Sequence, residues 1–394
     1  MENYGKNIFR IDFNLYCFFS CQKEKEQEIS ILKVDYEGTP DLAKVEDMQN
    51  YMQIRFQPLE TQDSAYFRLK SSVVKTYKDK IFVNDMRADV VLVFDETGRF
   101  LNRINHKGEG PEEYVSILEF MPCNDRLYIL DMRKRVQVYD FKGEYMKTIP
   151  LKKGGSQFYV TPDEQLYISG RFNREYFWTV QDNQGNIIQE YFPVNEKLRK
   201  FEIPMPTSGT IGFYDGGVYL TNFLDYNIYQ LKKDEISVLA RMDFGNMNIP
   251  DDFYEGSVEV VEKRFNDLRG SVKKGIKAVL SIEYLFVTDD WIVFLPGELA
   301  VRGIYYNRKT GFWMTTKYFT EPYRTFLTGN NLPDGYNPET GEFYRLVSAM
   351  DLKEVIENIS ASDKDYLEKY PCFKGIDFKK IDDNTNDFVL FFKL

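Results

Sequence analysis

Short apolar segments separated by polar turns recur along the chain. Three stretches that begin at Lys80, Arg126 and Gln165 each carry an apolar run, a polar turn, a second apolar run, the motif Asp-x-x-Gly and a further apolar run. Apolar runs of about four to eight residues between turn residues are typical of β-strands. The pattern therefore predicts a series of β-hairpins.

The Asp-x-x-Gly motifs have a mechanical explanation. An aspartate side chain can hold a type I turn, and a glycine can adopt the positive φ that lets a short hairpin close. We therefore expect these aspartates to stabilise turns rather than to bind metal or take part in catalysis. The pairs are Asp95 with Gly98, Asp140 with Gly143, and Asp182 with Gly185.

The repeat has the length of a propeller blade. The three stretches begin 46 and then 39 residues apart, and four short strands in about 40–50 residues are typical of one blade. Weaker copies begin at Gly217 and Asp289. We expect an all-β fold, a six-bladed β-propeller that spans residues 28–394.

The sixth blade needs strands from both ends of the chain. Residues 342–350 and 388–394 are strand-like, and the alternating ISILKV at 29–34 is the candidate from the N-terminal side. Such a closure removes an exposed sheet edge. Two stretches, about 250–281 and 351–370, carry apolar residues at helical spacing, and we expect two short helical insertions on a propeller face.

The N-terminal segment, residues 1–27, resembles an export signal followed by a tether. Lys6 and Arg10 precede an apolar stretch at 15–19, and Ser20 precedes Cys21, the candidate for lipidation. This predicts a lipid-anchored protein of the cell envelope, on the outer membrane or cell surface, that contacts the membrane only through its anchor. Asp12 interrupts the apolar stretch, and a secreted or periplasmic protein is the alternative.

Charge and composition narrow the function. There are 51 basic and 61 acidic residues, a net charge of −10, which argues against nucleic acid as a partner. His106 is the only histidine, so a site with several histidines is excluded. No Asp-x-Asp-x-Asp-Gly loop occurs. We therefore expect no metal and no cofactor; calcium has no motif in its favour.

Two cysteines lie in the body of the chain, Cys123 and Cys372. They allow one disulfide at most, and two separate buried thiols are the favoured interpretation.

Three features resemble a known family, the six-bladed β-propeller lipoproteins of Bacteroidota, which are similar to NHL-repeat propellers. They are the segment Pro58-Leu59-Glu60-Thr61, the loop Gly108-Glu109-Gly110-Pro111-Glu112-Glu113-Tyr114 and the repeat itself. Glu112 stands where the family usually has glycine. The resemblance implies the propeller fold over about residues 28–394. It implies little about function, because similar propellers include lyases, lactonases, binding modules and scaffolds.

Two groups of loop residues are candidates for a site. The first surrounds His106, Lys107 and Tyr114, where His106 or Tyr114 could act as a general base with Lys107 as a cationic partner. The same residues could simply shape the crossover between two blades. The second group is the repeated Asp-Met-Arg, which supplies two acid–base pairs for a polar or sugar-like ligand or for salt links between blades. These pairs are Asp85 with Arg87 and Asp131 with Arg133.

The leading hypothesis is a monomeric, non-catalytic module that binds a ligand such as a carbohydrate, or an envelope protein, or acts as a scaffold. The alternative is a propeller lyase or hydrolase acting on a carbohydrate or lactone. The sequence leaves open which of the two applies.

Overall fold

The structure is a computed structural model. It describes residues 29–67, 72–155, 157–169, 175–200, 211–214, 217–232, 235–273, 278–297, 302–320, 323–327 and 332–394. Cys21 and the predicted tether lie outside the described residues, so the lipidation site stays a prediction. No helix in the part of the chain that the structure describes is long and apolar enough to cross a bilayer.

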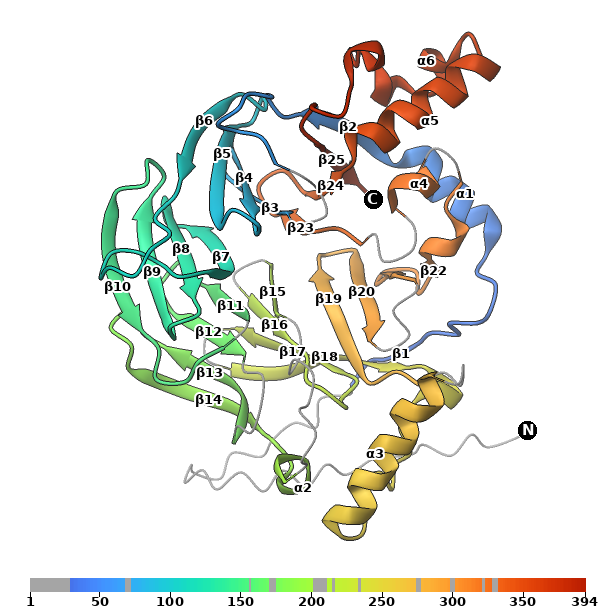
Figure 1. The fold of residues 1–394 in the computed structure, drawn as a ribbon. Coiled ribbons are helices and arrows are strands. Elements are labelled where there is room, and N and C mark those ends of the chain that lie inside the picture. The colour runs from blue at the N-terminus through green and yellow to red at the C-terminus, as the bar shows by residue number, and fades with distance from the viewer. Residues whose placement is uncertain are drawn as a thin grey trace, which may run out of the picture.

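Six largely antiparallel sheets surround a common axis, as the sequence repeat predicted (Figure 1). In chain order the four strands of each blade are β3 (Ser72–Tyr77), β4 (Lys80–Asp85), β5 (Val90–Asp95) and β6 (Phe100–Ile104); β7 (Ile117–Cys123), β8 (Arg126–Asp131), β9 (Arg135–Asp140) and β10 (Tyr145–Pro150); β11 (Gln157–Val160), β12 (Leu166–Ser169), β13 (Tyr176–Gln181) and β14 (Ile187–Pro193); β15 (Ile211–Tyr214), β16 (Gly217–Leu220), β17 (Asn227–Lys232) and β18 (Glu235–Asp243); β19 (Ser281–Val287), β20 (Trp291–Gly297), β21 (Ile304–Asn307) and β22 (Trp313–Thr315); and β23 (Gly335–Asn337), β24 (Glu342–Val347), β25 (Phe388–Lys393) and β2 (Gln53–Pro58). We number these blades one to six. The first strand of each blade lies nearest the axis (Figure 1).

The hairpin turns confirm the predicted role of the repeated aspartates. Asp95 Oδ1 accepts the backbone N–H groups of Thr97 and Arg99, both at 3.0 Å. Gly98 has φ of +80°, and a Cβ atom at this position would lie 1.9 Å from the carbonyl oxygen of Pro58. Only glycine therefore suits both the turn and the close approach of the closing segment.

The ring closes differently from the sequence prediction. Residues 29–34 do not complete blade six; β2 does, pairing antiparallel with β25 along all six of its residues. The reason is connectivity, because Pro58-Leu59-Glu60-Thr61 leads directly from β2 toward blade one. Glu60 accepts the N–H of Phe100 at 2.7 Å, and this contact ties the closing segment to the outermost strand of blade one.

The predicted closing strand forms a different contact. β1 (Ile31–Lys33) pairs in parallel with β18 and becomes a fifth strand of blade four. The chain then passes through α1 (Leu42–Tyr51) to β2 in blade six. Gln49 on α1 accepts the N–H of Thr320 at 2.8 Å. Residues 31–58 therefore form a strap that passes the outer side of blade five (Figure 1).

Helices occur where the sequence predicted insertions, with shifted boundaries. They are α2 (Glu196–Arg199), α3 (Val258–Lys273), α4 (Tyr323–Leu327), α5 (Ala349–Ser362) and α6 (Tyr366–Lys369), with short 3-10 turns η2 (Gly245–Met247), η3 (Thr316–Tyr318), η4 (Pro371–Phe373) and η5 (Phe378–Lys380). Figure 1 shows α3, α5 and α6 at the outer rim of the ring, whereas the sequence interpretation placed them on a face. They lie at the rim because their apolar faces join the cores of neighbouring blades: Phe265 of α3 meets Phe223 of blade four, and Ile356 of α5 packs in the core of blade six.

The two body cysteines are separate free thiols. Cys123 is buried among apolar residues of blades two and three, and Cys372 lies beside blade six. Burial raises the pKa of both thiols to about 11. The favoured sequence interpretation is confirmed, and the alternative disulfide does not form.

Candidate functional site

The crossover from blade one to blade two, residues 105–116, contains the first predicted site. Lys107 Nζ lies 2.6 Å from Asp89 Oδ2. Asp89 Oδ1 also accepts the Ser116 hydroxyl at 2.9 Å and the Ile117 N–H at 3.1 Å. Burial opposes the ionisation of Asp89, but these hydrogen bonds together outweigh it and lower its pKa. Asp89 therefore anchors the crossover to the β4–β5 turn.

Tyr114 is fully buried in this crossover. Its hydroxyl donates to the carbonyl oxygen of Asp89 at 2.8 Å and accepts the N–H of His106 at 3.2 Å. Burial raises the pKa of Tyr114 to about 12. The phenol thus stays protonated near neutral pH, which does not suit a general base.

His106 is half-buried, and its ring stacks on Tyr139 of β9. The ring centroids are 4.7 Å apart and the planes are inclined by 18°. This places His106 and Tyr114 in one aromatic group, because Tyr139 also meets Tyr114 edge to face at 6.2 Å. The structure therefore brings the two predicted residues together, in a packed arrangement.

One face of β9 holds the crossover by a ladder of side-chain donors. Arg135 and Gln137 both donate to the carbonyl oxygen of Glu113, at 2.6 and 2.7 Å. Tyr139 donates to the carbonyl oxygen of Glu112 at 2.6 Å. Alternate residues of a strand point to the same face, so positions 135, 137 and 139 act as a row. The glycine usual in the resembling family is not needed at Glu112 for this contact.

The two Asp-Met-Arg copies have different surroundings. Asp131 is fully buried and accepts the N–H of Val115 at 3.0 Å and Arg135 Nε at 2.9 Å. Asp85 is half-buried and caps its own turn through the N–H of Arg87 at 3.0 Å. Arg133 donates to the carbonyl oxygen of Glu109 at 3.0 Å. Within the described residues, no hydrogen bond or ion pair joins the two copies to each other.

A further cluster, absent from the sequence analysis, lies on the innermost strands. Tyr284 occupies a bulge in β19, between the pairs Glu283 with Leu295 and Phe286 with Val293. Its φ is +50°, a left-handed conformation that is rare for a bulky residue. The side chain is 57% exposed. A strained bulge that presents an exposed ring beside the axis is typical of functional positions.

Asp334 and Arg345 flank Tyr284 from blade six. Asp334 is exposed at its surface yet lies deep among protein atoms, and burial raises its pKa although Arg345 opposes the shift. Asp334 Oδ2 accepts the N–H of Leu346 at 2.8 Å. Arg345 Nη1 donates to the carbonyl oxygen of Leu332 at 3.2 Å. The charge of Asp334 also acts on the phenol of Tyr284, so the two side chains lie near each other.

The cluster extends around the axis to blades one and two. Lys75 Nζ of β3 lies 2.9 Å from Glu119 Oε1 of β7. Tyr344 is buried, and its phenol is within electrostatic range of both Asp334 and Glu119. We define the axial cluster as Tyr284, Asp334, Arg345, Tyr344, Lys75 and Glu119.

The axis narrows toward the far ends of the inner strands. Tyr214 of β15 and Tyr336 of β23 belong to blades four and six, and their ring centroids are 5.8 Å apart at an interplanar angle of 61°. Tyr214 also contacts Asp289 in the β19–β20 turn. Asp334 precedes β23 and thus lies nearer the opposite end. The two rings therefore form a floor beyond Tyr284.

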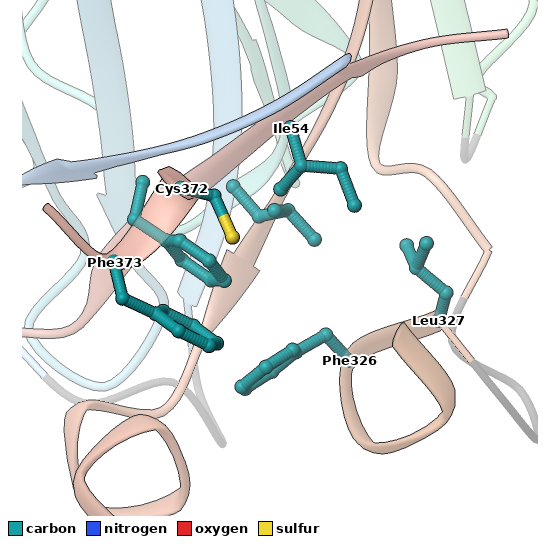
Figure 2. A pocket seen from close by; sticks show the side chains of 7 residues that line it. Ile54, Phe326, Leu327, Cys372 and Phe373 are labelled. Atoms are coloured by element: carbon teal, nitrogen blue, oxygen red, sulfur yellow. The ribbon is translucent and has the colours of Figure 1, made fainter. Parts of the chain in front are cut away.

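An apolar hollow lies at the rim, between β2, β25, α4 and η4 (Figure 2). It is lined by Ile54, Phe56, Phe326, Leu327, Cys372, Phe373 and Leu390. Phe56 stacks on Phe373 at 5.6 Å and meets Phe326 edge to face at 5.2 Å. Cys372 supplies a thiol, and its raised pKa keeps that thiol protonated near neutral pH. The hollow therefore offers packing rather than chemistry.

The described residues contain no group of three or more His, Cys, Asp or Glu side chains placed to hold a metal ion. The axial cluster was missed in the sequence because its members are far apart along the chain. Tyr284 lies within an apolar strand, and Asp334 lies in Pro-Asp-Gly, which is typical of a turn.

A family model described as a domain of unknown function, DUF4934, matches residues 29–393. No curated protein matches the chain. Among solved structures, a protein described as exported, from Bacteroides fragilis, shares 17% identity and a TM-score of 0.67 over 93% of this chain and 99% of its own. A DUF4221 member from Bacteroides vulgatus has 11% identity and a TM-score of 0.37, covering 65% and 76%. A protein of unknown function from Bacteroides caccae has 11% identity and a TM-score of 0.37, covering 63% and 82%. At 17% identity, the first similarity supports the fold alone.

Proposed function

Because the chain belongs to the DUF4934 family, whose description names no activity, we propose its function from its geometry: a non-catalytic binding module whose ligand contacts the axial cluster. The observation that carries this proposal is Tyr284, an exposed aromatic ring in a left-handed bulge beside the axis. Strain of this kind costs roughly 1–2 kcal/mol and persists where the arrangement serves a purpose.

The proposed location is the cell envelope, and the proposed anchor is a lipid on Cys21. The N-terminal pattern supports both, and the similar protein from Bacteroides fragilis is described as exported. The wider resemblance to propeller lipoproteins of Bacteroidota belongs to the same proposal. Metabolic labelling with a radioactive fatty acid tests it: the full chain should incorporate the label, and Cys21→Ser should not. A labelled Cys21→Ser chain would show that the anchor lies elsewhere.

Replacement of Tyr284 tests the binding module before any ligand has been identified. Tyr284→Gly removes the left-handed strain, so its melting temperature should equal or exceed that of the natural chain. The matched control is Tyr51→Gly, which removes an 82% exposed tyrosine from the last turn of α1 and should lower the melting temperature. A lower melting temperature for Tyr284→Gly would show that the ring stabilises the fold, and the proposal would then lose its main support.

A further inference from the structure

The axial cluster brings together acids and bases in near balance. Lys75 and Glu119 form an ion pair at 2.9 Å, and Arg345 lies within electrostatic range of Asp334. Each charge thus has a partner in the protein. A ligand with a net charge would meet a counter-charge that is already engaged.

The surroundings also disfavour any added charge. Burial raises the pKa of Asp334 and lowers that of Arg345, because each side chain loses hydration that stabilises its ionised form. A charged ligand at the same place would lose hydration in the same way. A neutral ligand with hydroxyl groups would avoid this loss and still satisfy the polar atoms.

The exposed groups suit one particular neutral surface. The ring of Tyr284 offers an apolar face of the kind that stacks on the C–H face of a sugar ring. Asp334 accepts the N–H of Leu346 through Oδ2, and a carboxylate has about four lone-pair sites in all. A hydroxyl beside the stacked ring could donate to such a carboxylate.

We propose that the axial cluster binds one ring of a neutral carbohydrate, stacked on Tyr284 with a hydroxyl donated to Asp334. This inference rests on the proposed function, because it names the ligand class of that same site. The floor formed by Tyr214 and Tyr336 limits how far a glycan could pass along the axis. The site is therefore suited to the end of a glycan chain.

Calorimetric titration of the chain from residue 29 onward tests the ligand class. The probes are neutral disaccharides of glucose, mannose, galactose and N-acetylglucosamine, with digalacturonate and sialyllactose as anionic probes and glucosamine as a cationic probe. At least one neutral disaccharide should bind, with an affinity that changes less than about twofold between low and high salt because no net charge is screened. Binding restricted to charged probes, or to none, would overturn the inference.

Variants assign the binding to these residues. Tyr284→Ala and Asp334→Asn should each weaken binding about tenfold or more, whereas Tyr284→Phe keeps the ring and should stay within about threefold. Tyr51→Ala, at a distant exposed tyrosine, should bind as the natural chain does. Binding of charged probes that still depends on Tyr284 would refute the sugar class but keep the binding module. Binding of a neutral sugar that is indifferent to Tyr284 and Asp334 would refute the assigned site.

Discussion

Lys107 and Asp89 form the contact that ties the first crossover to the blade before it. Their Nζ and Oδ2 atoms are 2.6 Å apart, and the carboxylate also binds Ser116 and the N–H of Ile117. The predicted site residue Lys107 thus has a structural partner that lies 18 residues earlier. The crossover is therefore held in place by contacts within the protein.

Replacement of Asp89 should destabilise the propeller more than replacement of Asp85. Asp89→Ala leaves Lys107 and two further donors without their acceptor, and we expect a loss of about 3 kcal/mol. Asp85 binds only the N–H of Arg87 among the described contacts, and Asp85→Ala should cost about 1 kcal/mol. Urea unfolding of both variants measures the difference, and equal losses would contradict the anchoring role of Asp89.

The Asp89 contribution should depend on pH. Its pKa is lower in the folded chain than in the unfolded chain, so its stabilisation is present above about pH 4 and is lost as the pH falls through the folded value. The difference in unfolding free energy between the natural chain and Asp89→Asn should therefore shrink below about pH 4. A constant difference between about pH 7 and about pH 3 would show that the carboxylate charge contributes nothing.

Tyr114→Phe should lower stability through one buried hydroxyl. The hydroxyl donates to Asp89 and accepts from His106, and its removal should cost about 1–2 kcal/mol. Tyr51→Phe is the matched control, because its exposed hydroxyl should contribute almost nothing. Thermal unfolding measures both. An unchanged melting temperature for Tyr114→Phe would remove the structural explanation and leave the hypothesis of Tyr114 as a general base in force.

Removal of the closing strand should be far more damaging than removal of β1. A chain that begins at residue 59 lacks β2 and exposes the edge of β25, whose sequence FVLFFK is almost entirely apolar. Exposed apolar edges associate with other chains, so we expect aggregates in size-exclusion chromatography. A chain that begins at residue 35 loses only three parallel pairs and should stay monomeric. Monomers from both chains would show that closure by β2 is dispensable.

The free thiols should be unreactive in the folded chain. Burial raises the pKa of Cys123 and Cys372 to about 11, so little thiolate exists near pH 8. In the chain from residue 29 onward, Ellman's reagent should therefore react slowly before denaturation and with both thiols after it. Reaction with neither thiol in denaturant without reductant would indicate a disulfide.

Much of the fold could be predicted because a blade is a local unit. Asp95 and Gly98 form a turn within a few residues, so the motif alone carries the information. The closing strand was misplaced because 29–34 and β2 both alternate between apolar and polar residues. Pairing with β25 depends on residues at the opposite end of the chain, and no local pattern reports that pairing.

The candidate site depended on the tertiary structure to a greater degree. The crossover around His106 stands out in the sequence for its unusual residues, and the structure places them in a packed contact with Tyr139. Tyr284 was missed because a bulge in a strand depends on the pairing of its neighbour, β20. Asp334 was missed because its Pro-Asp-Gly context is that of an ordinary turn.

The sequence by itself determined the blade repeat, the turn chemistry and the helical insertions, because these follow from interactions between residues close along the chain. Only the tertiary structure decided which strand closes the ring, how far apart the two cysteines lie and which side chains meet at the axis. Those outcomes depend on how six blades pack around one another. Tyr284 and Asp334 come from different blades, and only the closed ring brings them together.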